Sequence, residues 1–303
     1  MRLLLTGAWG EARQHVPELE AMGHEIAFLP QEKDLLPVDP AWPEGVICNG
    51  LFLYHPIAAF TALRFIQLTA AGFDRVDPDA ARAMGIRVCN ARGVYSRPMA
   101  EFALCGVLEL YKQSAFFRAG QQARRWEKRR DLRELGGKRV LILGCGSVGR
   151  TCAQIFGTLG CQIFGVDLAP MALPEFEQIL SIQAPSALDE QLSCADVVLV
   201  TLPLTPETRG LLDAARLGLL RRDAVLVNLS RGPVVDEQAL IRALQTGALG
   251  GAVLDVFERE PLDPASPLWA LPNVILTPHN SFVGEGNAQR LWAVIRQNLA
   301  QQP

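Results

Sequence analysis

The stretch RVLILGCGSVG, residues 139–149, determines the fold prediction. Apart from its first arginine, Arg139–Leu143 is a continuous apolar run, which is typical of a strand covered on both faces of a sheet. Three glycines follow at the spacing G-x-G-x-x-G, and a helical pattern follows them over Ser147–Leu159. A strand, a glycine-rich turn and a helix in this order begin a βαβ unit, so we expect a parallel, doubly wound sheet.

The glycine turn has the features of a dinucleotide-binding site. Gly144 would permit a tight turn, Gly146 would let a pyrophosphate approach the backbone, and Gly149 would let the helix pack against the strand. The N–H groups of the first helical turn, at Ser147 and Val148, would then face the phosphates. The alternative is a generic glycine-rich connection that binds nothing.

A carboxylate at the end of the next strand indicates which dinucleotide is bound. Asp167 ends the predicted strand Gln162–Asp167, where it can accept hydrogen bonds from the hydroxyls of the adenosine ribose. A 2′-phosphate would meet a like charge at this point, and the following Leu168–Pro170 supplies no cation. The sequence therefore favours NAD over NADP.

Alternating strands and helices extend over most of the chain and indicate two α/β domains. The range 1–98 is predicted to contain the strands Leu3–Leu5, Glu25–Leu29, Val46–Cys48, Phe65–Leu68 and Arg87–Cys89. The range 99–280 begins with an apolar helical pattern over Met99–Ala119, and its later strands are predicted at Asp196–Thr201, Ala224–Asn228, Gly250–Asp255 and Asn273–Thr277. The remaining residues, 281–303, contain an amphipathic helical pattern over Asn287–Gln301.

Composition excludes several classes of protein. The 303 residues carry 29 Lys and Arg against 32 Asp and Glu, so no electrostatic reason exists to expect nucleic acid or an anionic membrane as partner. No apolar run has the length of a membrane helix. Seven cysteines without any Cys-x-x-Cys pair suggest reduced thiols in a cytoplasmic protein and no metal site. The charged range 124–131 favours a solvated connector or oligomer arm over an anion-binding patch.

Three polar clusters follow strand ends in the second domain, at Asn228–Gly232, Asp255–Leu262 and Thr277–Asn280. The carboxyl ends of parallel strands face one crevice, so a guanidinium, a carboxylate and an imidazole should gather there. Arg231 could grip a substrate carboxylate, His279 could exchange a proton, and Glu260 would favour a charged imidazolium. The alternatives are a surface ion pair for Arg231, an ordinary turn carboxylate for Glu260 and a loop cap for His279.

These clusters resemble the signatures of the D-isomer-specific 2-hydroxyacid dehydrogenases. The resemblance is carried by Asn228-x-x-Arg231-Gly232-x-x-Val235-Asp236-Glu237, Asp255-Val256-Phe257-Glu258-x-Glu260-Pro261-Leu262 and Thr277-Pro278-His279. The glycine turn, the segment Leu202–Thr208 and the run Ala70–Asp74 fit the same family. The family resemblance implies a Rossmann-type cofactor domain inserted into a smaller flavodoxin-like substrate domain, and a homodimer formed through the cofactor domain.

The resemblance also implies a role for individual residues. Arg231 would bind the substrate carboxylate, His279 would be the acid and base, and Glu260 would pair with His279. Backbone N–H groups at Ala71 and Gly72 would contact the same carboxylate. The cofactor groove would be formed by Pro203, Thr208, Asn228, Ser230 and Asp255, with Asp255 holding the nicotinamide carboxamide.

Some features depart from the family pattern or narrow it. Asn280–Gly284 stands where the family often has an Ile-Ala-Gly-like run, so the family pattern does not predict the local pocket wall. Apolar Leu68 and the absence of a regulatory domain argue against a phosphorylated substrate, and Glu260 argues against the formate dehydrogenase branch. We expect a short 2-keto acid such as glyoxylate or hydroxypyruvate. The rival is an NAD(H)-sensing binding protein that resembles the family's transcriptional corepressors. The histidines at 15, 24 and 55 are interpreted as structural.

Overall fold

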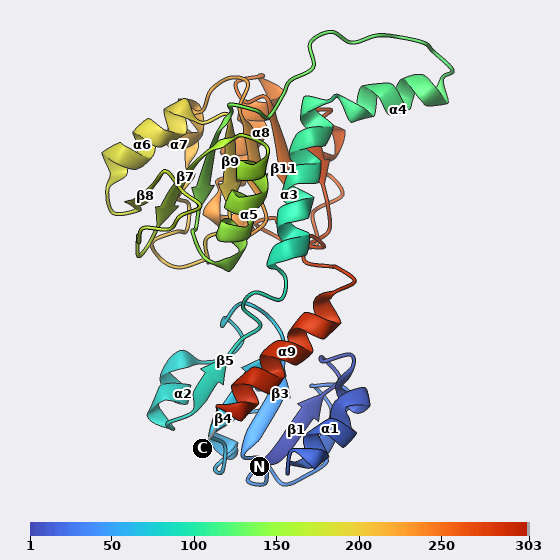
Figure 1. Cartoon of the computed structure of the whole chain (residues 1–303), viewed down its shortest axis with the longest axis vertical. Helices are drawn as coiled ribbons and strands as arrows, with labels where there is room; N and C mark the ends of the chain where they lie inside the picture. Colours follow the sequence, from blue (N-terminus) through green and yellow to red (C-terminus); the bar gives the residue numbers. More distant parts are fainter. Residues whose placement is uncertain (302–303) are drawn as a thin grey trace. The chain divides into compact units, whose positions relative to one another are not determined.

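The computed structural model describes residues 1–301, and within them the chain forms two compact units (Figure 1). The first unit contains Met1–Tyr95 together with the chain from Gly284 onward, and the second contains Ser96–Val283. The second unit therefore interrupts the first in sequence. These boundaries lie within a few residues of the predicted ones at 98 and 280.

The first unit is built on a parallel sheet in the order β2-β1-β3-β4-β5, the flavodoxin-like strand order. The fold prediction for this part of the chain is confirmed. Its strands are β1 (Arg2–Thr6), β2 (Glu25–Leu29), β3 (Gly45–Cys48), β4 (Phe65–Leu68) and β5 (Arg87–Cys89). Its helices are α1 (Val16–Ala21), α2 (Pro78–Ala83) and α9 (Asn287–Ala300), with 3-10 turns η1 (Ala12–His15), η2 (Leu51–Leu53) and η3 (Ile57–Ala59).

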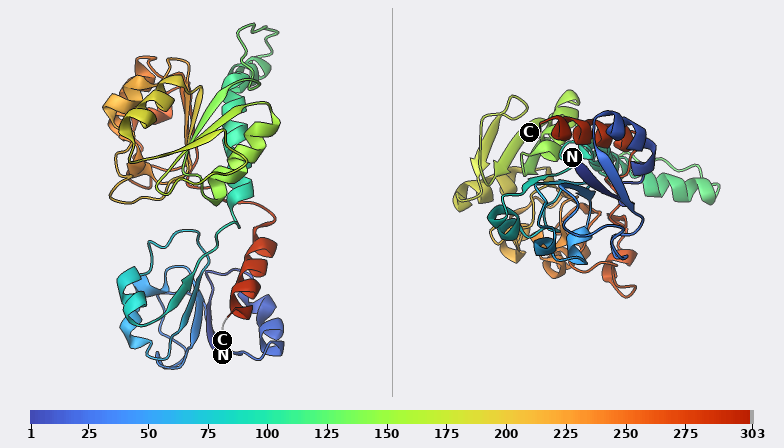
Figure 2. Two further views of the ribbon diagram at one scale, coloured as in Figure 1. Left: turned by 60° about the vertical axis from the view of Figure 1, so that its left-hand side comes forward. Right: turned by 90° about the horizontal axis from the view of Figure 1, so that it is seen from below.

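Helix α9 returns to the first unit and completes one face of its sheet. Leu291, Ile295 and Leu299 recur at helical spacing and pack with β1 and with α1, whereas α2 covers the opposite face (Figure 2). The buried Gln67 on β4 accepts a hydrogen bond of 2.7 Å from Asn298. The amphipathic pattern read from the sequence thus marks a helix with a buried stripe.

We expect Ile295→Ala to lower the free energy of unfolding by about 2–5 kcal/mol, since Ile295 is fully buried and its truncation leaves a cavity. Urea unfolding followed by circular dichroism measures this change. Gln297→Ala, on the exposed face of the same helix, is the matched control and should stay within about 0.5 kcal/mol of the parent protein. Equal losses in both variants would show that packing of the buried face of α9 does not determine the effect.

The second unit is a doubly wound parallel sheet in the order β12-β11-β10-β9-β6-β7-β8. Its strands are β6 (Arg139–Leu143), β7 (Gln162–Asp167), β8 (Gln178–Ser181), β9 (Val197–Val200), β10 (Val225–Asn228), β11 (Gly251–Leu254) and β12 (Val274–Leu276). Its helices are α3 (Ser96–Tyr111), α4 (Ser114–Gln122), α5 (Ser147–Thr158), α6 (Pro185–Cys194), α7 (Ala214–Leu219) and α8 (Glu237–Gln245), with turns η4 (Gly232–Val234) and η5 (Pro267–Ala270).

This strand order confirms the Rossmann prediction. Helices α3 and α5 cover one face of the sheet, and α6, α7 and α8 cover the other (Figure 2). Strand order reverses between β6 and β9, and ligands of such sheets bind outside the strand ends at that reversal. The fold therefore places the candidate site at the carboxyl ends of β6, β7, β9, β10, β11 and β12.

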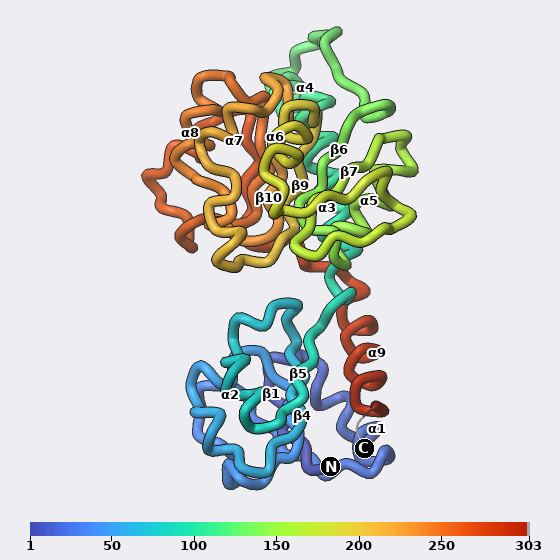
Figure 3. Tube along the Cα trace, turned by 90° about the vertical axis from the view of Figure 1, so that its left-hand side faces the viewer, coloured from blue at the N-terminus to red at the C-terminus, as the bar shows by residue number. Residues whose placement is uncertain are grey.

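Two local features differ from the sequence-based expectation. The helix expected over Met99–Ala119 is broken, because Gln113 adopts a left-handed conformation between α3 and α4. Strand β8 was not predicted, since it lies at the sheet edge with one exposed and three partly buried residues, which give no clear pattern. Helix α4 and the segment after it extend outward from the sheet of the second unit (Figure 1), and the segment after α4 also rises above the other elements of that unit in Figure 3.

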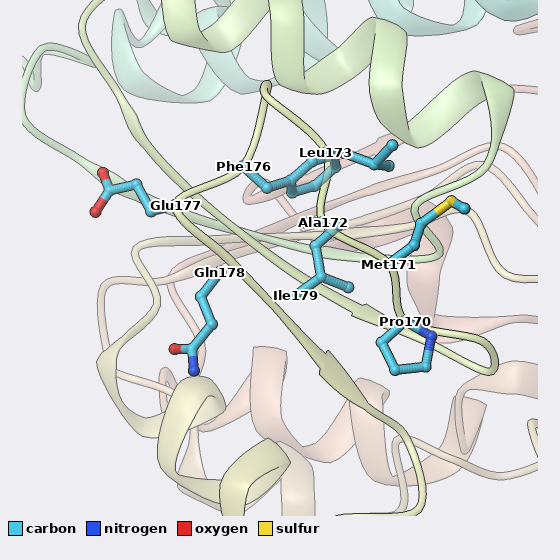
Figure 4. A pocket seen from close by; sticks show the side chains of 8 residues that line it. All are labelled: Pro170, Met171, Ala172, Leu173, Phe176, Glu177, Gln178 and Ile179. Atoms are coloured by element: carbon cyan, nitrogen blue, oxygen red, sulfur yellow. The ribbon is translucent and has the colours of Figure 1, made fainter.

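A hollow of about 360 Å³ lies beside β8, and Figure 4 shows its lining, Pro170–Leu173 and Phe176–Ile179. None of the predicted site residues is among these. Leu173, Phe176 and Ile179 belong to or pack against the core on the α5 face, while the polar side chains of Glu177 and Gln178 point away from them. Convergent polar groups are what a binding pocket needs, so the lining of this hollow does not indicate a binding site.

Candidate active site

The glycine turn between β6 and α5 has the close contacts that the motif predicts. Gly144 has φ +104°, and a Cβ atom there would lie 2.7 Å from the Leu202 nitrogen. A Cβ at Gly149 would lie 1.9 Å from the Gly144 oxygen, so helix and strand pack in direct contact. A Cβ at Gly146 would have no neighbour within 4 Å. The turn is tight on both sides and open at its centre.

The first turn of α5 faces this opening. The backbone N–H groups of Ser147 and Val148 belong to the set that a helix leaves without an intrahelical acceptor. The Ser147 hydroxyl lies 2.8 Å from the Ser96 hydroxyl at the start of α3, which ties the two helix starts together. The helix end thus offers backbone donors and a positive dipole to an anion.

Asp167, at the end of β7, lies beside the glycine turn. Its Oδ2 accepts a hydrogen bond of 2.6 Å from the Cys145 N–H, and its Oδ1 accepts one of 3.1 Å from the Ala169 N–H. Because the carboxylate is held at both oxygens, its negative charge has a fixed position next to the opening.

Cys145 occupies a variable position of the glycine turn and is buried. Burial, followed by the charge of Asp167, raises the pKa of its thiol to about 12. Burial also raises the pKa of Cys152, on α5, to about 12. Both groups are therefore protonated thiols near neutral pH. A nucleophilic or redox-sensing cysteine would have to be a thiolate, so these two cysteines do not have the properties of such a residue.

The segment Leu202–Thr208 follows β9 and is shaped by one buried hydroxyl. Thr208 donates a hydrogen bond of 2.6 Å to the Pro203 carbonyl and accepts one of 2.8 Å from the Thr205 N–H. The Thr208 hydroxyl thus forms its hydrogen bonds within its own loop and fixes the backbone at Pro203 and Thr205.

The loop after β10 carries the guanidinium. Buried Asn228 accepts hydrogen bonds from the Ser230 N–H (3.1 Å) and hydroxyl (2.9 Å), and it donates one of 3.2 Å to the Arg231 carbonyl. Arg231 itself is half-buried and donates to the Ser230 carbonyl at 2.8 Å. Asn228 and Ser230 therefore hold the backbone from which the Arg231 side chain extends.

The Glu260 carboxylate and the His279 imidazole form a pair, with 2.9 Å between Oε2 and Nδ1. The other Glu260 oxygen accepts a hydrogen bond of 3.1 Å from the Phe257 N–H. The Glu260 and His279 side chains are 37% and 42% exposed, so a ligand can reach them. Because Nδ1 of His279 is bound to Glu260, Nε2 is the nitrogen through which a ligand can exchange a proton. His279 has φ +52°, an unusual value for a non-glycine residue.

Asp255 is fully buried and holds the loop that carries His279. Its Oδ1 accepts hydrogen bonds from the Thr277 hydroxyl (2.6 Å) and the Asn280 N–H (2.7 Å), and its Oδ2 accepts one from the Ser281 N–H (3.0 Å). The Asp255 carbonyl also accepts from the His279 N–H at 2.8 Å. These bonds account for the left-handed backbone at His279, because they fix both sides of it.

In the first unit, Ala71 and Gly72 follow the carboxyl end of β4. The Ala71 carbonyl accepts a hydrogen bond of 2.5 Å from Asn90, and the Ala70 carbonyl accepts one of 2.9 Å from the Ala91 N–H. Both bonds use carbonyl groups of this turn, so its conformation is fixed from the β5 side.

The remaining histidines lie in the first unit. His15 stacks against both Trp9 and Trp292, with ring centroids 5.3 Å and 4.2 Å away. His55 contacts the Glu32 carbonyl through Nε2 at 2.9 Å. Burial, followed by the charge of the N-terminus, lowers the pKa of His24. Each contact is within the unit, which agrees with a structural role for the three.

Sequence reasoning did not single out Glu237 and Glu258, which join two of these loops. Each lies inside a quoted motif, but the signal that pairs them is their reciprocal hydrogen bonding, which spacing alone does not reveal. Among residues 1–301, no group of three or more His, Cys, Asp or Glu side chains is arranged to hold a metal ion. In the same part of the chain, no helix combines the length and apolarity of a membrane span.

Comparison with known proteins identifies relatives along the chain. Residues 104–281 match the family model "D-isomer specific 2-hydroxyacid dehydrogenase, NAD binding domain". A glyoxylate reductase of Aeropyrum pernix is 36% identical over 245 residues, which cover 78% of this chain and 72% of that protein.

Solved structures share the whole fold. A D-isomer specific 2-hydroxyacid dehydrogenase family protein from Aeromonas salmonicida has a TM-score of 0.83 and 30% identity, covering 100% of this chain and 96% of that one. A D-isomer specific 2-hydroxyacid dehydrogenase from Xanthobacter autotrophicus, solved with NADPH and MES, has a TM-score of 0.79 and 32% identity, covering 99% and 96%.

Proposed function

The chain belongs to the D-isomer specific 2-hydroxyacid dehydrogenase family and is an NAD-dependent oxidoreductase, and on this premise we propose that it interconverts a small 2-keto acid and its D-2-hydroxy acid. The observation that carries the proposal is the Glu260–His279 pair, 2.9 Å apart, at strand ends of the same sheet as the glycine turn. A glycine turn, an arginine and a carboxylate–imidazole pair are the groups that this reaction requires.

The residues beside the glycine turn fit NAD. The open space at Gly146 can take a pyrophosphate, the first-turn N–H groups of Ser147 and Val148 can bind it, and Asp167 can accept from ribose hydroxyls. When bound, the nicotinamide supplies or accepts the hydride. We assign Pro203, Thr208, Asn228, Ser230 and Asp255 to the wall of the cofactor groove, where Thr208 and Asp255 act by holding the loops.

Three residues act on the substrate in this proposal. Arg231 binds the carboxylate through its planar fork and polarises the adjacent carbonyl. In reduction, His279 gives the proton on Nε2 to the carbonyl oxygen while the hydride forms the new C–H bond at C2. Glu260 keeps the ring oriented through Nδ1 and stabilises the imidazolium. In oxidation His279 takes the hydroxyl proton back.

The backbone N–H groups of Ala71 and Gly72 are proposed to bind the substrate carboxylate as well, which is the role that the family resemblance gives this turn. We propose a short 2-keto acid such as glyoxylate or hydroxypyruvate as substrate. The relative from Aeropyrum pernix is named a glyoxylate reductase, which supports this class.

We also propose a homodimer formed through the second unit and a cytoplasmic location. The segment after α4 presents Trp126 at 95% exposure, with Phe117 on α4 and Leu132 also exposed. Exposed apolar side chains on a segment that is otherwise charged favour contact with a second copy, in agreement with an oligomer arm. All seven cysteines are free, which favours a reducing compartment.

The loss of NADH absorbance with glyoxylate, hydroxypyruvate and pyruvate tests the proposed reaction. We expect oxidation of NADH with at least one of them and formation of the D-hydroxy acid, identified by chiral chromatography. NADH binding without oxidation by any of the three would instead favour an NAD(H)-sensing binding protein.

We expect Asp167→Ala to change the cofactor preference. The carboxylate both attracts the ribose hydroxyls of NADH and repels a 2′-phosphate, so its loss should lower kcat/KM for NADH and raise it for NADPH, shifting the ratio by about a hundredfold. Steady-state kinetics with both cofactors at fixed salt measure the ratio. Asp189→Ala, at the Arg216 ion pair, is the control. An unchanged ratio in Asp167→Ala would remove the electrostatic explanation.

A further inference from the structure

Two glutamates form a reciprocal pair of hydrogen bonds between catalytic loops of the second unit. Glu237 is the first residue of α8, after the Arg231 loop, and Glu258 follows β11 in the loop that carries Glu260. The Glu258 N–H donates to Glu237 Oε2 at 3.1 Å, and the Glu237 N–H donates to Glu258 Oε1 at 3.3 Å. Each carboxylate therefore binds the backbone of the other loop.

The local electrostatics explain how two like charges coexist here. The N-terminus of α8 carries a positive partial charge, and its first N–H groups have no intrahelical acceptor, so a carboxylate is favourable there. Burial raises the pKa of the Glu237 carboxyl and the charge of Glu258 adds to this, while the hydrogen bond from the Glu258 backbone opposes the shift. The pair is thus held by its backbone donors against mutual repulsion.

The same two loops touch through their backbones at Gly232. A Cβ atom on Gly232 would lie 1.9 Å from the Phe257 carbonyl carbon and 2.4 Å from the Glu258 nitrogen, so any larger residue would separate the loops. The Phe257 N–H in turn donates to Glu260, the partner of His279. A continuous series of contacts therefore runs from the residue after Arg231 to the His279 ring.

We propose that Glu237 and Glu258 are positioning residues, which clamp the loop of Arg231 to the loop of Glu260 and so fix the guanidinium relative to the imidazole. The proposal rests on the roles of Arg231, Glu260 and His279 given above. Neither glutamate touches the reacting atoms. Their effect is on alignment, and errors of about 1 Å in such alignment can lower rates by about a hundredfold.

Glu237→Ala and Glu258→Ala test the clamp. Each removes one of the two bonds, and we expect kcat/KM for the keto acid, per NADH-binding site, to fall about tenfold. Calorimetric titration counts the sites, and the Kd for NADH should change less than twofold. Glu237→Gln keeps an acceptor oxygen and should restore kcat/KM to within about threefold of the parent enzyme.

Asp213→Ala is the matched control, since the Asp213 carboxylate caps α7 through the Arg216 N–H at 2.9 Å, a bond within α7 and its cap. It should cost similar thermal stability and leave kcat/KM per site unchanged. Two outcomes overturn the clamp: Ala variants that keep kcat/KM within twofold, or a Gln variant as impaired as the Ala variant. Full turnover in His279→Ala would instead overturn the proposed function and leave the clamp without its premise, so the two failures are distinguishable.

Discussion

His279→Ala is expected to lower kcat for reduction of a 2-keto acid by about a thousandfold, the scale of a lost general acid. The carbonyl oxygen would then have to take its proton from water as the hydride arrives. The affinity for NADH should change little, because His279 lies on the loop after β12 and not on the glycine turn. Stopped-flow measurement of NADH oxidation at saturating cofactor reports the chemical step.

A second substitution at the same pair separates proton transfer from ring orientation. Glu260→Gln keeps a polar group at hydrogen-bond distance from Nδ1 but removes the charge that stabilises the imidazolium, so we expect a smaller loss, about tenfold to a hundredfold. His24→Ala, in the first unit, should leave kcat within twofold. Turnover retained in His279→Ala, with the control unaffected, would assign the proton to another group.

The strand ends could be predicted because they depend on pattern. Buried strands of a doubly wound sheet are apolar throughout, as in Val197–Val200, and polar residues directly after them lie at one edge. The Glu260–His279 contact follows from that rule together with the family motifs, although the two residues are nineteen positions apart in sequence. Pattern thus predicted that these two candidate residues meet.

The contacts between loops could not be predicted in the same way. Asp255 was expected to hold the cofactor, and spacing gave no sign that three donors of the His279 loop surround it. Likewise nothing in the sequence shows that Gly232 lies against Phe257. Such contacts depend on how loops fold back over a sheet edge, which local propensity does not encode.

The break between α3 and α4 could not be predicted from the sequence either. Gln113 has no glycine-like signature, and the apolar pattern continues on both sides of it, yet its backbone is left-handed. Its side chain donates to the Leu110 carbonyl at 3.1 Å, which satisfies one of the groups exposed at the end of α3. A local side-chain bond therefore accompanies the end of α3 at a residue where the apolar period alone would continue the helix.

Arg231→Gln is expected to lower kcat/KM for the keto acid by about a thousandfold, or about 4 kcal/mol of transition-state stabilisation. The guanidinium supplies the charge that binds the substrate carboxylate and, through the same fork, polarises the carbonyl. Both a higher KM and a lower kcat should result. Arg231→Lys keeps the charge but not the two parallel donors, so it should recover only part of the loss, mainly in KM.

The comparison between these two variants decides what Arg231 does. If the lysine variant recovers kcat as fully as KM, charge alone is sufficient and the fork has no part in polarising the carbonyl. If neither variant differs from the parent enzyme, the carboxylate is bound elsewhere. Arg222→Gln, which removes only a 3.2 Å bond to the Gly247 carbonyl, controls for loss of a positive charge on the same unit. The Kd for NADH should change less than twofold in all of them, because neither Arg231 nor Arg222 is among the residues assigned above to the cofactor.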